Sequence, residues 1–216
     1  MTITAAADGS ALGNPGPAGW AWYIDDDRWA AGGWPHGTNN MGELKAVLEL
    51  FRATAGVDDD LLVLCDSQYV INSVVKWMPG WKRKGWRKAD GSPVMNVELM
   101  QDIDAALQGR RYRFEWVKGH VGHELNEAAD ERARAAATAY QRGGEPDAGP
   151  GFGGAPVAAR PAAAAAAPAL FETEAAPLKQ VVVGFSTAEL RALTNRAKRA
   201  GTTPEQLLRS LALEER

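Results

Sequence analysis

The sequence is poor in cysteine: Cys65 is the only one among 216 residues. A single thiol cannot form an internal disulfide framework, which excludes the small disulfide-stapled secreted folds and suits a reducing cytosol. Because Cys65 ends the apolar run LLVLC, we expect a buried structural thiol and not a nucleophile.

Long apolar runs are also missing. No apolar stretch is long enough to cross a bilayer, and the alanine run Ala162–Ala167 is short and bracketed by prolines. The first residues, MTITAAADGS, lack a basic segment followed by an apolar one, so no signal peptide is evident. With 45% hydrophobic and 24% charged residues, the composition is that of an ordinary globular protein, and we expect a cytoplasmic location without a membrane partner.

An overall excess of positive charge is the third absence, since the formal net charge is -3. Nucleic-acid-binding domains are usually basic, so the average argues against such a partner. The local distribution differs, because Trp81–Lys88 (WKRKGWRK) places five basic residues among eight, between aromatic ones. The acidic runs Asp25–Asp27 and Asp58–Asp60 lower the average, and we expect them to be solvated turns.

Strand and helix patterns alternate along the first two thirds of the chain. We expect a mixed sheet with flanking helices, with Asn39 or Asn40 capping the first helix and Pro79-Gly80 stopping the second. A turn rich in glycine and proline, Leu12–Gly19, should separate the first two strands. The expected strands are Ile3–Ala7, Trp20–Ile24, Arg28–Trp34, Leu61–Cys65 and Arg111–Val117, and the expected helices are Met41–Ala55, Ser67–Trp77, Asn96–Leu107 and Glu124–Tyr140.

Three carboxylates, Asp8, Glu43 and Asp66, stand where a strand ends or a helix begins, and a fourth, Asp130, lies on the helix Glu124–Tyr140. Asp66 follows a buried strand, at the edge where open α/β sheets bind ligands. Four acidic groups that meet from four elements repel one another unless a cation joins them, and carboxylate oxygens suit hard divalent cations. Taken singly, Asp8 and Asp66 would be better explained as turn and cap residues.

The segments DGS, TNNMGE, CDSQYV and KGHVGHELNEAAD, in this order, resemble the bacterial type 1 ribonuclease H family over about residues 1–142. The resemblance implies an α/β fold with a five-stranded mixed sheet and hydrolysis of the RNA strand of RNA–DNA hybrids, leaving 5′-phosphate and 3′-hydroxyl ends. It implies two Mg²⁺ ions, with Mn²⁺ as a substitute, held by Asp8, Glu43, Asp66 and Asp130. Gly42 departs from the larger or charged residues often found before the glutamate, at some cost in helix propensity.

The three histidines differ in their expected roles. By its motif position His120 matches a loop histidine that helps proton transfer or product release, and loop hydrogen bonding is the alternative. For His123 a structural role is the stronger hypothesis, and His36 should lie at the surface. None of these histidines has the pairwise helical spacing of a zinc site.

Substrate contacts are also implied by the resemblance. The basic segment matches a protrusion that grips the DNA strand, where lysine and arginine neutralise phosphates. A solvated helix face is the alternative, and the tryptophans could stack on substrate or only pack. The amides suit minor-groove edges and 2′-hydroxyls, although Asn40 and Asn96 could serve only as helix caps. The implied contacts are Asn14, Asn39, Asn40, Gln68, Trp81, Lys82, Arg83, Lys84, Trp86, Arg87, Lys88 and Asn96.

The remainder of the chain divides into two parts. Residues 143–178 are dominated by glycine, alanine and proline, and we expect a flexible linker. Residues 179–216 resemble, more weakly, a ribbon-helix-helix module: a strand QVVVGF and two helices. Such a unit could make a homodimer or bind another protein, and an amphipathic hairpin without a partner is the alternative. A nucleic-acid-binding protein that has lost catalysis is the competing function, and the intact carboxylate set argues against it.

Overall fold

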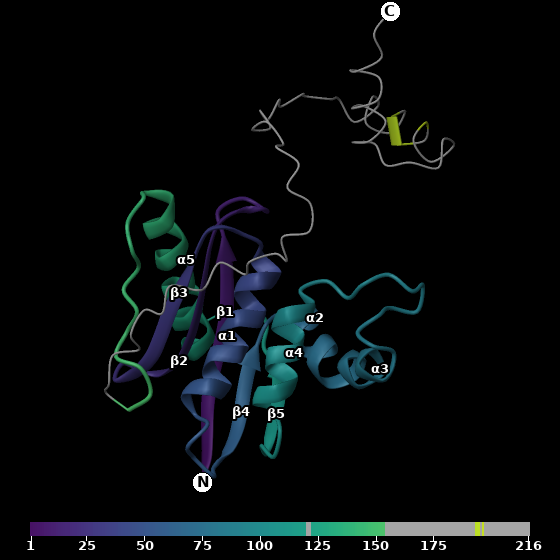
Figure 1. Ribbon diagram of the computed structural model, residues 1–216. Coiled ribbons are helices and arrows are strands. Elements are labelled where there is room, and N and C mark those ends of the chain that lie inside the picture. Colours follow the sequence, from purple (N-terminus) through teal and green to yellow (C-terminus); the bar gives the residue numbers. More distant parts are fainter. Residues whose placement is uncertain (120–121, 154–192, 195, 197–216) are drawn as a thin grey trace, which may run out of the picture. The chain divides into compact units, whose positions relative to one another are not determined.

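The computed structural model describes residues 1–119, 122–153, 193, 194 and 196. Its centre is a five-stranded sheet in the order β3-β2-β1-β4-β5 (Figure 1). β1 and β3 are antiparallel to β2, whereas β4 runs parallel to both β1 and β5. The sheet is therefore mixed, as the sequence predicts. The strands are β1 (Thr2–Ala11), β2 (Gly16–Asp25), β3 (Arg28–Gly37), β4 (Asp60–Cys65) and β5 (Tyr112–Trp116).

Helices cover both faces of this sheet (Figure 1). Side chains alternate along β1, so Ala5 and Ala7 join one apolar cluster with α1 and α4, while Ala6 joins a second cluster with α5. A strand covered on both faces is apolar throughout, which explains the continuous run in β4 and the burial of Cys65. The helices are α1 (Asn39–Ala53), α2 (Gln68–Ile71), the π-helix η1 (Asn72–Trp77), α3 (Met78–Arg83), α4 (Val97–Ala106) and α5 (Glu124–Gln141).

The cap of α1 differs from the prediction. Neither Asn39 nor Asn40 caps the helix; Thr38 does, and its hydroxyl accepts a hydrogen bond from the Met41 N–H at 3.2 Å. The amide of Asn39 is thereby available for another contact. The predicted core side of this helix is confirmed, because Leu44, Val47, Leu48 and Phe51 are all buried.

Pro79-Gly80 does not stop the second helix. The helical path from Gln68 continues through η1 and then α3 as far as Arg83. Pro79 stands in the first turn of α3, where a missing N–H leaves no intrahelical bond unmade. The basic segment therefore begins on a helix, and the wider π-helical turn lies just before it.

The first strands are longer than predicted. β1 extends to Ala11 and β2 begins at Gly16, because Ser10 pairs with Gly19 and Ala11 with Ala18. Backbone pairing between the strands therefore extends into the glycine- and proline-rich segment, and the turn is confined to the residues between Ala11 and Gly16. The other strands and helices predicted before residue 142 are present, with ends that differ by a few residues.

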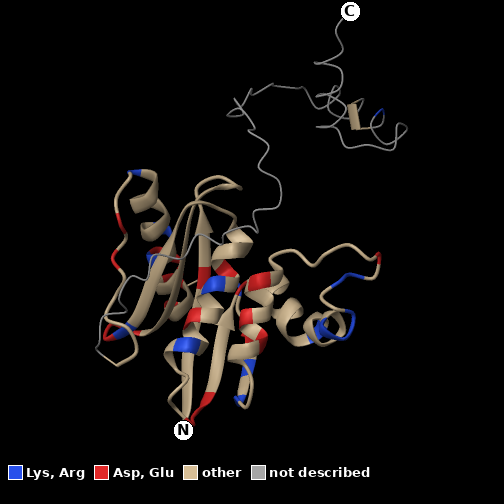
Figure 2. Cartoon of the chain, in the orientation of Figure 1, with Lys and Arg blue, Asp and Glu red and all other residues tan. Residues whose placement is uncertain are grey.

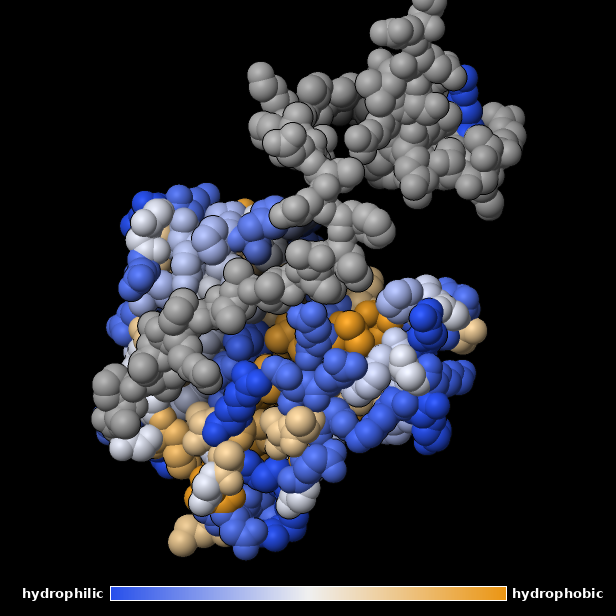
Figure 3. Space-filling model, viewed as in Figure 1, coloured by the Kyte–Doolittle hydropathy of each residue, from blue (hydrophilic) through white to orange (hydrophobic). Residues whose placement is uncertain are grey.

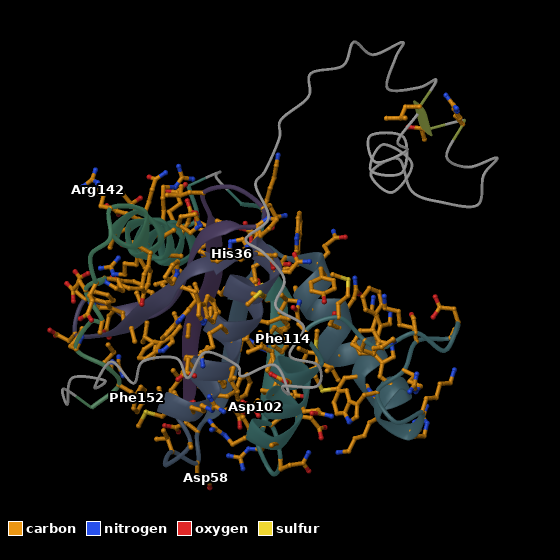
Figure 4. All side chains as sticks on the ribbon, turned by 45° about the horizontal axis from the view of Figure 1, so that its top comes forward. His36, Asp58, Asp102, Phe114, Arg142 and Phe152 are labelled. Atoms are coloured by element: carbon orange, nitrogen blue, oxygen red, sulfur yellow. The ribbon has the colours of Figure 1, made fainter. Side chains whose placement is uncertain are left out.

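The start of the expected linker packs on the sheet. We call Asp147–Phe152 the edge strap, because it runs beside the outer strand β3 after the end of α5 (Figure 1). The Gly151 N–H donates to the Trp29 carbonyl at 3.0 Å, and the Ala31 N–H donates to the Ala148 carbonyl at 3.2 Å. Phe152, labelled in Figure 4, packs against the cluster of α1 and α4. Side-chain composition gave no sign of this pairing, which uses backbone groups and glycines.

The chain divides into two compact units, Met1–Ala166 and Ala167–Arg216. Of the second unit only residues 193, 194 and 196 are described, and they are helical. The strand and the remaining helical residues expected within 179–213 lie outside the described residues. No helix in the described part of the chain is both long and apolar enough to span a membrane.

Candidate active site

Three of the four predicted carboxylates meet at one end of the central strands. In the parallel pair of β1 and β4, Ala6 lies opposite Leu64, so Asp8 and Asp66 follow at the same level. Glu43 comes from the first turns of α1, which packs across β1. Oxygen atoms of Asp8, Glu43 and Asp66 all lie within 4.8 Å of one another. The structure thus brings together residues from three separate segments of the sequence.

Asp130 lies on α5, on the opposite face of the sheet from α1. Its charge raises the pKa of Asp8, so it is close enough to act on the cluster electrostatically. The Arg134 guanidinium lies 3.7 Å from an Asp130 carboxylate oxygen, one helical turn further along. Asp130 is thus not one of the three residues whose oxygens lie within 4.8 Å of one another, and it has a basic neighbour on its own helix.

Burial changes the acidity of the two innermost carboxyls. Asp8 is 5% exposed and Glu43 is 8% exposed. Burial, followed by the charge of Asp66, raises the pKa of Asp8 from its usual 3.8 to about 8. Burial is also the main cause that raises the pKa of Glu43 from 4.5 to about 7, with Asp66 contributing. At neutral pH the cluster therefore favours either a proton or a cation among its oxygens.

Neutral donors hold these two carboxyls in place. The Gly9 N–H donates to Asp8 Oδ1 at 2.7 Å, the Ser67 hydroxyl to Glu43 Oε2 at 2.6 Å, and the Asn39 amide to Glu43 Oε1 at 2.8 Å. These hydrogen bonds stabilise the charged forms, but burial outweighs them. Oxygen ligands that converge in this way suit a hard divalent cation, which would supply the missing positive charge. The donor set therefore fits the metal site that the sequence predicts.

Two glycines allow α1 to approach β1 closely enough for Glu43 to reach Asp8. A Cβ added to Gly9 would collide with the backbone of Gly42 and Glu43, and one added to Gly42 would collide with the Gly19 carbonyl. Gly42 is thus a packing requirement, and its cost in helix propensity is the smaller effect. Sequence reasoning saw the departure at Gly42 but not its purpose, which depends on a partner strand.

Asp66 is held from the β5 side. The Trp116 indole N–H donates to the Asp66 carbonyl at 3.0 Å. A Cβ on Gly119 would collide with the Asp66 carboxylate. The glycine after β5 therefore leaves room for the carboxylate, a role that the motif alone did not reveal.

The histidines fall in three different places. His120 lies outside the described residues. His123 occupies the N-cap of α5, and its carbonyl accepts a hydrogen bond from the Glu127 N–H at 2.9 Å, in keeping with a structural role. His36 is exposed near the end of β3, as expected.

The basic segment forms a protrusion beside the body of the domain, where lysine and arginine gather (Figure 2). Lys82, Arg83, Lys84 and Arg87 are exposed, and Lys88 is half-buried. Lys82 pairs with Asp104 at 2.6 Å, and Arg87 donates to the Gly91 carbonyl at 2.9 Å. Four of the five side chains therefore present charge to solvent.

The two tryptophans of this segment differ. Trp86 has a left-handed backbone conformation with φ 62°, and its backbone N–H donates to the Trp81 carbonyl at 2.7 Å. The Trp86 side chain packs against the main hydrophobic core. Trp81 lies 5.7 Å from Trp77, measured between ring centroids. A cavity of about 360 Å³ opens beside them, lined by Tyr69, Trp77, Trp81, Lys88, Val94 and Met95.

This aromatic cavity includes residues that sequence reasoning missed. Trp77 is 42% exposed and Met95 is 61% exposed, which is unusual for side chains of this size. Figure 3 shows apolar surface next to the strongly hydrophilic protrusion. Because the predicted helix ended at Trp77, nothing in the sequence indicated that Trp77 and Trp81 lie one turn apart on a continuous helical path.

The predicted amide contacts are only partly brought together. The Asn14 side chain accepts a hydrogen bond from the Asn39 N–H at 3.3 Å, so both lie beside Glu43. Gln68 is exposed at the start of α2, and Asn40 is half-buried on α1. Asn96 stands at the N-cap of α4 with φ 54°, but its side chain makes no capping hydrogen bond. Asn96 therefore occupies the N-cap position of α4, but its side chain does not cap the helix.

The sheet order and the buried carboxylates define the class of divalent-metal-dependent nucleases. The RNase H family model matches residues 1–138. The ribonuclease H of Tropheryma whipplei (strain Twist) is 53% identical over 150 residues, covering 69% of this chain and 93% of the relative. The ribonuclease H of Methylorubrum extorquens (strain PA1) is 42% identical over 226 residues, covering 99% of this chain and 91% of the relative.

Solved structures agree with the sequence relatives. The crystal structure of LC9-RNase H1 has a TM-score of 0.55 and 31% identity, covering 65% of this chain and 74% of that chain. The chain therefore belongs to the RNase H family, and it is an enzyme that hydrolyses phosphodiester bonds. Its resemblance to a ribonuclease H, predicted from four short segments, is confirmed.

Proposed function

We propose that this protein cuts the RNA strand of RNA–DNA hybrids, leaving 5′-phosphate and 3′-hydroxyl ends. The observation that carries the proposal is the convergence of Asp8, Glu43 and Asp66, with oxygens within 4.8 Å of one another, in a chain of the RNase H family. Two curated relatives carry the name ribonuclease H at 53% and 42% identity. The alternative, a nucleic-acid-binding protein that has lost catalysis, does not explain why the acidic cluster is buried and intact.

Asp8, Glu43, Asp66 and Asp130 would hold two Mg²⁺ ions, which Mn²⁺ could replace. When bound, such ions activate a water and stabilise the leaving oxygen of a phosphodiester. The protein contributes the fixed positions of the carboxylates: Ser67 and Asn39 orient Glu43, and the Gly9 N–H orients Asp8. Asp130, on α5, would complete the ligand set from the side of the sheet opposite α1.

Proton transfer needs a group that titrates near neutrality. His120 is the proposed shuttle between the cluster and solvent, because an unperturbed imidazole changes charge in this range. In the sequence His120 directly follows Gly119, where an added Cβ would collide with the Asp66 carboxylate. His120 would thus act on the water or on the leaving group, and the carboxylates would keep their metal role.

The hybrid would lie across the carboxylate cluster and the protrusion. Lys82, Arg83, Lys84, Arg87 and Lys88 would neutralise phosphates of the DNA strand. Trp81 and the aromatic cavity would contact a deoxyribose or base of that strand, with Trp86 supporting the loop from inside. The amides of Asn14, Asn39, Asn40, Gln68 and Asn96 would read minor-groove edges and 2′-hydroxyls, the group that separates RNA from DNA.

A gel assay with three end-labelled substrates tests this function. The substrates are an RNA–DNA hybrid, double-stranded RNA and duplex DNA of one sequence, each with Mg²⁺ or with EDTA. We expect cleavage of the RNA in the hybrid with Mg²⁺ and of nothing else, with products that a 5′-phosphate-dependent exonuclease degrades. Equal cleavage of all three duplexes, or of none, would refute the proposal.

A further inference from the structure

The seat of α5 on the sheet is built from small side chains. Ala21, Ala31, Ala133 and Ala136 form one buried cluster between the helix and strands β2 and β3. Where the helix comes closest, a Cβ on Gly19 would collide with the backbone of α5. Nearer the start of the helix, Leu125 and Ala129 pack in a second cluster with Tyr23 and Leu64. Over β2 and β3, however, the contact consists of methyl groups, which interlock less than large side chains do. A polar contact in this region would therefore add to the packing in fixing the position of α5.

Arg132 makes that contact. Its guanidinium carbon lies 4.4 Å from the ring centre of Tyr23 and 4.7 Å from that of Trp29. The two rings are cross-strand partners on β2 and β3. Arg132 also donates to Asp26 at 3.3 Å, and Asp26 accepts a second hydrogen bond from the Tyr23 hydroxyl at 2.9 Å. We call Tyr23, Asp26, Trp29 and Arg132 the arginine clamp.

The edge strap lies against the clamp. A Cβ added to Gly149 would be 2.6 Å from the Trp29 ring, so the strap backbone lies directly on the indole. Both edge hydrogen bonds of the strap flank this ring, one at Trp29 itself and one at Ala31. The strap therefore limits the movement of Trp29, which in turn contacts Arg132.

The clamp is close to the chemistry along the helix. Arg132 comes two residues after Asp130, within the same turn of α5. At this spacing the two side chains point in different directions, with Arg132 towards the β2–β3 hairpin and Asp130 towards Asp8. A helix held at Arg132 can neither shift along its alanine-lined contact with β2 and β3 nor rotate about its axis without breaking the contacts of the clamp.

We propose that the arginine clamp, backed by the edge strap, is a positioning device that sets the place of Asp130 relative to Asp8 and Asp66. This inference rests on the proposed function, in which Asp130 is a metal-binding carboxylate. Arg132 is a positioning residue and not a catalytic one, because its side chain is only 22% exposed and its guanidinium is in contact with both rings. Affinity for the metal then depends on a contact outside the carboxylate cluster.

Three full-length variants test the clamp. Arg132→Met removes the charge and the planar stack, Arg132→Lys keeps the charge, and Arg142→Met removes an exposed arginine just beyond the end of the same helix (Figure 4). Mg²⁺ binding is measured by calorimetry without nucleic acid, and kcat and KM are measured on the hybrid below the melting temperature. For Arg132→Met we expect about tenfold weaker Mg²⁺ binding, as for other supporting residues of metal sites.

A kinetic split separates positioning from general stability. We expect Arg132→Met to lower kcat, with KM for the hybrid unchanged because the protrusion is untouched, and raised Mg²⁺ to restore part of the rate. Arg132→Lys should recover part of the affinity, and Arg142→Met should match the parent. A lower melting temperature for Arg132→Met with parental Mg²⁺ affinity and kcat would overturn the inference.

The strap is tested without touching the arginine. Gly149→Ala places a Cβ against Trp29 at φ +76°, whereas Gly153→Ala adds one in open space. Weaker Mg²⁺ binding by Gly149→Ala alone supports the inference. If Gly149→Ala and Gly153→Ala bind Mg²⁺ equally well, the edge strap has no role in positioning Asp130. Failure of the proposed function would appear in the parent itself, as absent hybrid cleavage, whereas failure of this inference would appear only in the variants.

Discussion

Asp8 carries the largest electrostatic cost of the site. Its carboxyl is buried beside Asp66, Glu43 and Asp130, and the Gly9 N–H only partly offsets the repulsion. In the absence of a cation the folded protein retains a proton on Asp8 at pH values where the unfolded chain has lost it. The residue that we propose as a metal ligand is therefore a source of instability when no cation is bound.

The stability of the metal-free protein should fall as pH rises from about 4 to about 8. A carboxyl with a folded pKa of about 8 and an ordinary pKa of 3.8 binds more protons in the folded state across this window, so rising pH favours unfolding. Asp8→Asn removes the contribution of Asp8 to this dependence, while the smaller contribution of Glu43 remains. In EDTA at pH 8 we expect the variant to melt at least about 4 °C above the parent, since each kcal/mol shifts a domain of this size by about 2–4 °C. Parallel melting curves of the two proteins against pH would contradict this account.

Gly42 should show the reverse of normal helix propensity. An alanine replacing a helical glycine usually stabilises by about 1 kcal/mol. At Gly42 the new methyl would collide with the Gly19 carbonyl, whereas at Gly80 in α3 it would meet nothing within 4 Å. Gly42→Ala should therefore lower the melting temperature and the cleavage rate, and Gly80→Ala should raise or keep the melting temperature. Stabilisation by both substitutions would show that α1 does not need its close approach to β1.

The acidic residues could be predicted from sequence, but their supports could not. Asp8, Glu43 and Asp66 stand in short segments with recognisable neighbours, and the structure brings them together. Gly42, Gly119 and Ser67 act through atoms of distant segments, so nothing local reveals them. Asp130 was predicted by the same pattern, while the contacts of Arg132 depend on two strands far from it in sequence.

The helical connection through η1 and α3 sets the protrusion apart from the sheet. Pro79 was expected to end the helix, yet a proline in a first turn lets a new helix begin there. Propensity alone cannot distinguish these outcomes, because both place proline next to a helix boundary. The consequence is an exposed basic element beside an aromatic cavity.

Neutralising the protrusion should weaken binding far more than chemistry. We expect the combined change of Lys82, Arg83, Lys84, Arg87 and Lys88 to glutamine to raise KM for the hybrid with little change in kcat. The slope of log K against log salt should flatten by about 0.9 for each phosphate that the variant no longer neutralises. A set of changes at Arg52, Arg111 and Arg113, outside the protrusion, serves as the control. A salt slope equal to that of the parent would show that the segment is a solvated helix face that makes no phosphate contacts.

At the scale of the whole molecule, composition predicted a linker from residue 143, but the chain leaves the sheet later. The edge strap occupies β3 with backbone hydrogen bonds and glycines, neither of which gives a hydrophobic signal. Covering the outer strand also removes exposed N–H and C=O groups from that edge. We therefore propose a nuclease domain that includes the strap, followed by the linker and the unit from residue 179.

Two truncations test this division. Ending the chain after Gly153 should leave a domain that melts and cleaves like the parent, whereas ending it after Arg142 should lower the melting temperature by exposing Trp29 and the edge of β3. Light scattering on the full chain tests the proposed pairing through residues 179–213, since a unit of that size has little core of its own. Equal melting temperatures of the two truncated proteins would show that the strap does not belong to the nuclease domain. A full chain that is monomeric at tens of micromolar, above a dimer Kd of about 10⁻⁶ M, would refute the homodimer.

In the proposed mechanism Asp8 and Asp66 hold the metal ions that are needed to cleave the hybrid. Its most direct test is the initial rate of cleavage of a 5′-labelled RNA–DNA hybrid by the parent, Asp8→Asn and Asp66→Asn, with Mg²⁺ and with EDTA. We predict cleavage by the parent with Mg²⁺, none in EDTA, and rates for both folded variants lowered by more than about 10³-fold, as expected when a metal ligand is removed. Cleavage by both variants within tenfold of the parent would contradict the account.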